Sequence, residues 1–98
     1  MIVKTKPFDE AEYLETDADI AGYMTEALAT GDKALITHAL GVVARARGMT
    51  RIAQETGLSR ESLYRALSAE GNPEFATVLR ILQAIGLRLT AEPVSKAA

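Results

Sequence analysis

Residues 49–68 read MTRIAQETGLSRESLYRALS, with the spacing of two short helices joined by a tight turn. Ala53 stands where the second helix crosses close over the first, and a larger side chain there would push the two apart. Gly57 follows four residues later, in a turn whose left-handed backbone conformation costs glycine least. Residues 49–68 are therefore predicted to form a helix-turn-helix.

The apolar residues of the same stretch predict which faces are buried. Ile52, Leu58, Leu63 and Leu67 fall at positions that face inward and pack the helix pair against its neighbours. The side chains left for solvent or DNA on the second helix are Arg60, Glu61, Ser62, Tyr64 and Arg65. A small residue and a glycine at this spacing also occur in generic helical hairpins. The register of the buried positions, together with a helix cap at Ser59, favours DNA binding.

Helical periodicity with capping residues covers most of the remaining chain. Each predicted helix starts at a Ser, Thr, Asp or Asn and stops at a glycine, which are common capping signals. In chain order the predicted starts and stops are Thr16 or Asp17 to Gly31, Asp32 to Gly48, Thr50 to Gly57, Ser59 through about Glu70 to Gly71, and Asn72-Pro73 to Gly86. This pattern predicts an all-α fold with five helices.

The two ends of the chain depart from the helical pattern. Residues 1–15 mix a proline and aromatic residues with carboxylates, and they are predicted to form an extended N-terminal arm that docks through its rings. Residues 87–98 begin with alternating apolar and polar side chains, which predicts one short C-terminal β-strand and a tail. A lone strand needs a partner, either the arm or the same strand of a second subunit. Residues 16–86 are the predicted helical domain.

The net charge of −2 hides opposite charges in the two parts of the chain. Residues 1–32 hold two basic and eight acidic side chains, whereas residues 33–98 hold nine basic and five acidic ones. Five arginines lie between residues 45 and 65, in and beside the predicted helix-turn-helix. Such a basic stretch is typical of a nucleic-acid-binding surface, although an ordinary solvated surface can have the same composition.

Several short motifs surround the helix-turn-helix and together span nearly the whole chain. They are Lys6-Pro7-Phe8-Asp9, Tyr13-Leu14, HALGVVARARGMT over residues 38–50, Ile52-Ala53, TGLSRESLY over residues 56–64, Ala66-Leu67-Ser68 and Gly71-Asn72-Pro73. In these motifs the sequence resembles the lambda-repressor-like (Xre-type) helix-turn-helix domains and, within them, the addiction-module antidote proteins of bacterial and prophage type II toxin–antitoxin pairs. The resemblance implies a cytoplasmic homodimer that represses its own operon and neutralises a cognate RelE/ParE-like toxin. Residue spacing by itself predicts only the DNA binding.

In a helix-turn-helix the start of the second helix enters the major groove, where its first exposed side chains reach base edges. Here these are Arg60, Glu61 and Ser62, and Arg60 is the expected reader through a bidentate contact to guanine. Glu61 either accepts a hydrogen bond from cytosine or orients Arg65 one turn later. Tyr64 and Arg65 are expected to reach the DNA backbone or thymine methyl groups.

Short polar side chains near helix starts complete the predicted DNA-binding set. Thr50, Gln54, Ser59 and Asn72 resemble positions that bind phosphate through hydroxyl or amide groups and exposed backbone amides. For Thr50 and Asn72, helix capping is an equally good interpretation. The two roles can coexist.

One monomer offers few phosphate contacts, so useful affinity needs two copies on half-sites about one helical turn apart. The predicted dimerisation residues are Ile85, just before the predicted C-terminal strand, and Leu87 and Leu89 within it. The alternative is that this segment folds onto the core of its own chain.

The composition argues against several kinds of chemistry. The chain has no cysteine, which removes disulfides, thiolate nucleophiles and Cys-based metal sites. His38 is the single histidine and has no second His or Cys with which to bind a metal. With no glycine-rich phosphate loop either, we expect a protein without a cofactor, a metal or enzymatic activity. The lack of a signal-peptide pattern and of a long apolar stretch predicts a cytoplasmic protein outside the membrane.

Three interpretations of function are open at this point. The leading one is an autoregulatory antitoxin, whose acidic N-terminal third attracts a basic toxin. A stand-alone prophage-type repressor would share the DNA-binding part and would lack a toxin encoded beside it. A helical protein-interaction module without DNA binding would use Arg60 and Arg65 only as solvated charges.

Overall fold

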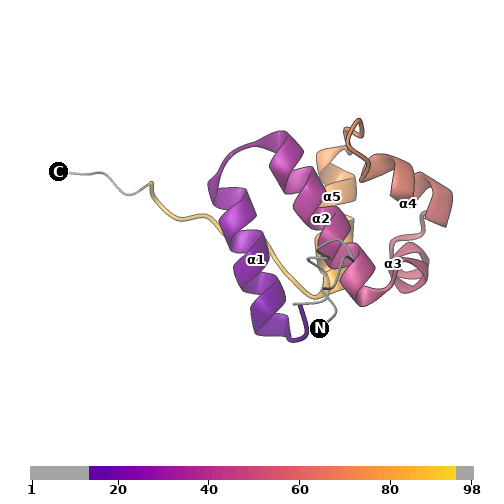
Figure 1. Cartoon of the computed structure of the whole chain (residues 1–98), viewed down its shortest axis with the longest axis horizontal. Coiled ribbons are helices and arrows are strands. Elements are labelled where there is room, and N and C mark those ends of the chain that lie inside the picture. The colour runs from indigo at the N-terminus through magenta and orange to yellow at the C-terminus, as the bar shows by residue number, and fades with distance from the viewer. Residues whose placement is uncertain (1–13, 95–98) are drawn as a thin grey trace, which may run out of the picture.

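The computed structural model describes residues 14–94, and over this range the chain forms five α-helices (Figure 1). They are α1 (Asp17–Ala29), α2 (Lys33–Arg47), α3 (Met49–Thr56), α4 (Arg60–Ala66) and α5 (Phe75–Ile85). The prediction of an all-α fold with five helices is confirmed for the described residues. Residues 1–13 of the predicted N-terminal arm lie outside the described range.

Helix α2 lies at the centre of the arrangement. It contacts α1, α3 and α5, while α3 also contacts both α5 and α4 (Figure 1). Every helix contributes a fully buried side chain to one common core, and in chain order these include Ile20, Leu40, Ile52, Leu63 and Ile81. The position of α4 is therefore set by the same apolar core that holds the other four helices together.

Side-chain caps define the starts of α1 and α2 as predicted. Thr16 Oγ1 accepts a hydrogen bond from the Asp19 amide at 3.0 Å, and Asp19 Oδ2 accepts one from the Thr16 amide at 3.1 Å, which makes a reciprocal capping box. The hydrogen bonds from Thr16 lower the pKa of the Asp19 carboxyl, because they stabilise its charged form. Asp32 caps α2 by accepting hydrogen bonds from the amides of Ala34 and Leu35.

The prediction of a C-terminal strand is wrong for the described part of the chain. Gly86 ends α5 with a φ of 99°, and the Leu87 amide then donates to the Leu82 carbonyl at 2.8 Å. The following residues pass beside α1, where Leu28 and Leu89 line the same groove, and they form no strand (Figure 1). An alternating pattern becomes a strand only when its backbone pairs with another extended segment, and no such pair occurs within residues 14–94.

Candidate nucleic-acid interface

The turn between α3 and α4 has the geometry that its sequence predicts. Gly57 has a φ of 79°, in the left-handed region, and its amide donates to the Ala53 carbonyl at 3.0 Å. Ala53 is 6% exposed, so it leaves room for the second helix to approach the first. The four residues predicted to face inward all belong to the core or pack against it, namely Ile52, Leu58, Leu63 and Leu67. The two short helices and their tight turn are confirmed.

Two side chains that the sequence analysis did not single out hold this turn together. Thr56 is buried, and its hydroxyl donates to the Ile52 carbonyl at 2.8 Å and accepts from the Leu58 amide at 3.3 Å. Arg80 reaches across from α5 and donates through Nη1 to the Thr56 carbonyl at 2.8 Å. Arg80 gives a partner to a carbonyl that the end of α3 leaves unpaired, and the Thr56 hydroxyl gives one to the Leu58 amide just after the turn. Arg80 lies 24 residues from Thr56, so no local sequence signal predicts its contact.

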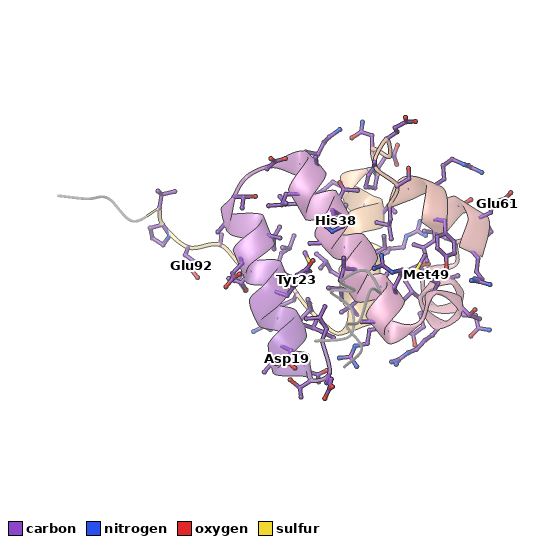
Figure 2. All side chains as sticks on the ribbon, in the orientation of Figure 1. Asp19, Tyr23, His38, Met49, Glu61 and Glu92 are labelled. Carbon is purple, nitrogen blue, oxygen red and sulfur yellow. The ribbon has the colours of Figure 1, made fainter. Side chains whose placement is uncertain are left out.

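Helix α4 buries a single residue and exposes most of its surface. Leu63 is the buried one of its seven residues. Ser59 caps the helix as predicted, since its Oγ accepts a hydrogen bond from the Ser62 amide at 3.0 Å. Ser62 is half-buried, and the exposed face of α4 consists of Arg60, Glu61, Tyr64 and Arg65. Glu61 lies at the outer edge of the molecule, far from α1 (Figure 2).

Arg60 and Tyr64 contact each other on the exposed face of α4. Arg60 Nη2 donates to the Tyr64 hydroxyl at 3.3 Å, and the guanidinium carbon lies 5.5 Å from the centre of the Tyr64 ring. Glu61 and Arg65 have the same four-residue spacing but form no ion pair in the described part of the chain. The structure therefore brings Arg60 and Tyr64 together and leaves Glu61 apart from Arg65.

Thr50 and Gln54 are exposed on α3, but Thr50 is not the helix cap. Helix α3 begins at Met49, and Gly48 is its N-cap residue without a side-chain hydrogen bond. Gly48 is the single residue between α2 and α3, and its φ of 102° lets the chain change direction there. The new helix starts too early for Thr50 to cap it, so the capping interpretation of Thr50 is wrong and its hydroxyl remains at the surface.

Helix α5 starts later than predicted. Glu74 is its N-cap residue and Phe75 its first residue, so the prediction that Asn72 and Pro73 open the helix is wrong. Asn72 Oδ1 instead accepts a hydrogen bond from Lys33 Nζ at 3.3 Å. Lys33 is the first residue of α2, 39 positions away, and the sequence analysis missed it. The contact places the Lys33 ammonium beside Asn72, a residue predicted to bind a DNA phosphate.

Helix α4 ends at Ala66, before the predicted end at about Glu70. The Ser68 hydroxyl donates to the Arg65 carbonyl at 2.9 Å, and in doing so competes with the backbone amide that would extend the helix. Gly71 lies so close that a Cβ at this position would come within 2.2 Å of the Ala66 carbonyl oxygen. The chain therefore turns back against the last turn of α4, which a continued helix would prevent.

Arg47 and Arg51, near the turn, form ion pairs within the chain. Arg47, at the end of α2, pairs with Asp17 at the start of α1, and Arg51 Nε lies 3.2 Å from Glu55 Oε2 along α3. The two arginines of α4 have no carboxylate partner among the described residues. Their positive charge is therefore available on the exposed face of α4.

The three predicted dimerisation residues differ in exposure. Ile85 is 5% exposed and Leu87 packs against the core, whereas Leu89 is 36% exposed. Ile85 and Leu87 therefore have little area left for a second subunit. The largest exposed apolar side chains of α5 are Phe75 and Leu79, one helical turn apart.

His38 lies on α2 in a groove between α1 and α2, which Tyr23, Glu26 and Leu35 also line. Figure 2 shows Tyr23 and His38 close to each other on these two helices, away from Glu61. Within residues 14–94, no group of three or more His, Cys, Asp or Glu residues is arranged to hold a metal ion. The predicted DNA-contacting residues lie elsewhere, on α3, at and along α4 and on the loop before α5, and of these Ser62, Arg65 and Asn72 line one groove.

A family model for probable addiction module antidote proteins matches residues 4–93. The chain belongs to this family. An uncharacterized protein of Haemophilus influenzae is 45% identical to the antidote over 92 residues, which cover 94% of this chain and 95% of the relative. No solved structure gives a significant match. An antidote of an addiction module implies a cognate toxin as its partner.

Among residues 14–94, no helix is both long enough and apolar enough to cross a bilayer.

Proposed function

We propose that this antidote is a DNA-binding antitoxin that represses its own toxin–antitoxin operon and neutralises a RelE/ParE-like toxin. It acts in the cytoplasm by binding, without catalysis and without a cofactor. The exposed face of α4 reads the operator, as in the lambda-repressor-like domains that the sequence resembles. The observation that carries the proposal is the make-up of α4, which is anchored by one buried side chain and presents four polar or aromatic ones to solvent.

The side chains of α4 have the chemistry that base reading requires. The major groove is about 12 Å wide and admits a helix, so the exposed face of α4 can meet base edges there. Arg60 donates to the two acceptors of guanine. Leu63 is buried and fixes α4 to the core, so the exposed side chains of α4 keep their positions relative to the rest of the domain. Glu61 has no ion pair with Arg65, which leaves its carboxylate to accept a hydrogen bond from cytosine.

A second set of residues holds the DNA backbone. Thr50 and Gln54 are exposed on α3, and Asn72 lies on the loop before α5 with the Lys33 ammonium 3.3 Å from its side-chain oxygen. Lys33 adds a positive charge beside Asn72, because hydroxyl and amide groups alone would give weak phosphate contacts. Ser59 combines its capping role with an exposed position at the start of α4.

The proposal includes a homodimer and an electrostatic contribution to toxin binding. Two copies place two α4 helices on half-sites about one helical turn apart, and Leu89 is the accessible member of the predicted dimerisation residues. The acidic α1, with Asp19 and Glu26 exposed, favours approach of a basic toxin. Membership of the antidote family supports this function over a stand-alone repressor.

Fluorescence anisotropy of the purified protein on its own upstream DNA and on scrambled DNA, across a salt series, tests the proposal. We expect two subunits to bind the upstream DNA selectively, with an affinity that falls as salt rises. Equal binding to both DNAs would overturn the DNA-binding part. Co-expression with the product of an adjacent small gene should yield a stable complex, and a stand-alone repressor would yield none.

Two variants separate base reading from backbone contact. Arg60→Ala should weaken binding to the upstream DNA by about 1–3 kcal/mol and change binding to scrambled DNA much less. Lys33→Met should weaken binding to both DNAs alike and reduce the slope of log affinity against log salt by about 1. An equal loss on both DNAs for Arg60→Ala would exclude Arg60 as a reader of sequence.

A further inference from the structure

We infer that Tyr64 is a positioning residue for Arg60, and that the pair rather than Arg60 alone determines which base the protein accepts. The base it selects is one with two acceptors in the major groove, which is guanine. This inference rests on the proposed function, because it concerns how the exposed face of α4 reads DNA.

Two contacts, both with the side chain of Tyr64, hold the Arg60 side chain in the free protein. The hydrogen bond from Nη2 to the Tyr64 hydroxyl, at 3.3 Å, fixes one end of the guanidinium group. The ring of Tyr64 lies 5.5 Å from the guanidinium carbon, within the range of a cation–π contact, and this restricts the position of the whole group. Residues four apart on a helix are neighbours, so the backbone of α4 itself sets this arrangement.

The guanidinium keeps the donors that it needs for a base. Arginine has five N–H donors and the Tyr64 hydroxyl takes one of them, so a pair of parallel donors remains for guanine. Holding a long side chain in one position before binding reduces the conformational entropy that binding removes. It also discriminates against bases whose acceptors lie elsewhere, because the arginine cannot reorient without losing both contacts with Tyr64.

Arg65 provides an internal comparison on the same helix. It is exposed like Arg60, and in the described part of the chain it contacts no aromatic ring and no carboxylate. An Arg65 without such contacts suits a phosphate, which accepts a cation from many directions, whereas an Arg60 held by Tyr64 suits a base edge, which accepts donors from one.

The test is a double-mutant cycle measured as the ratio of affinities for upstream and scrambled DNA. Tyr64→Leu should lower this ratio about tenfold, within the range of coupling between residues in contact. Tyr64→Phe, which keeps the ring and loses the hydroxyl, should give an intermediate ratio. In the Arg60→Ala background, Tyr64→Leu should leave the ratio unchanged. Circular dichroism should show the same helix content for all variants, because Tyr64 is 47% exposed.

The outcomes separate the inference from the proposed function. If the unmodified protein does not distinguish the two DNAs, the proposed function fails. If it does, and Tyr64→Leu lowers the ratio equally with and without Arg60, then Tyr64 contacts DNA itself and the inference fails. A Tyr64→Leu variant with an unchanged ratio overturns the inference as well.

A measurement without DNA checks the same contact. Nitrogen-15 relaxation of the arginine Nε groups in the free protein should show a more restricted Arg60 than Arg65. Tyr64→Leu should make the two equally mobile. Equal mobility in the unmodified protein would overturn the inference.

Discussion

Helices α3 and α4 belong to the same motif, yet they bury very different shares of their side chains. Helix α3 buries four of its eight residues, and it contacts α2, α4 and α5. Helix α4 buries only Leu63 of its seven. The two helices therefore differ in role: α3 mainly stabilises the fold through its buried side chains, whereas α4 mainly presents polar and aromatic side chains to solvent. Changes on the exposed face of α4 should therefore alter binding while the fold stays intact.

The strongest test of this comparison is to remove the one anchor of α4. Leu63→Ala should lower the free energy of unfolding by about 2–5 kcal/mol, since it creates a cavity at a fully buried position. Arg65→Ala, two residues along on the exposed face, should change it by less than about 0.5 kcal/mol. Urea denaturation of both variants measures the two values. Similar losses would mean that α4 is held by its surface rather than by Leu63.

A second test concerns the turn that joins the two helices. Gly57→Ala should cost about 1–2 kcal/mol, because alanine resists the left-handed conformation that a φ of 79° requires. Apart from Gly57 itself and its two chain neighbours, no residue has an atom within 4 Å of the added Cβ, so the cost is conformational and not steric. Gly22→Ala is the matched control: it lies inside α1 with equally open space and should stabilise the protein by about 0.5–1 kcal/mol. Thermal unfolding of both variants should give shifts of opposite sign, and a gain in stability for Gly57→Ala would contradict the turn geometry.

The turn was predictable because its signals act over a few residues. Ala53, Gly57 and Ser59 each depend on their own size, backbone conformation or hydroxyl group, and the structure confirms all three. The division of α4 into one buried and several exposed residues followed from helical periodicity in the same way.

The remaining features depend on partners that a local pattern does not reveal. Asn72 has the chemistry of a cap, but Lys33 from the start of α2 takes its side-chain oxygen. Arg80 stabilises the end of α3 from another helix. On α4, the spacing of Arg60 and Tyr64 equals that of Glu61 and Arg65, and side-chain conformation decides which pair forms a contact. The alternation after Gly86 lacked a second extended segment among the described residues.

The smallest of the expected effects concerns how the two helices begin. Helix α4 starts with a side-chain cap at Ser59, whereas α3 starts at Gly48 without one. Ser59→Ala should therefore cost about 1 kcal/mol, because the Ser62 amide loses its partner at 3.0 Å. Thr50→Ala, the control, should cost less than about 0.5 kcal/mol, since the Thr50 hydroxyl caps no helix. Chemical denaturation of both variants measures the difference, and equal costs would mean that Thr50 stabilises the start of α3 despite its position inside the helix.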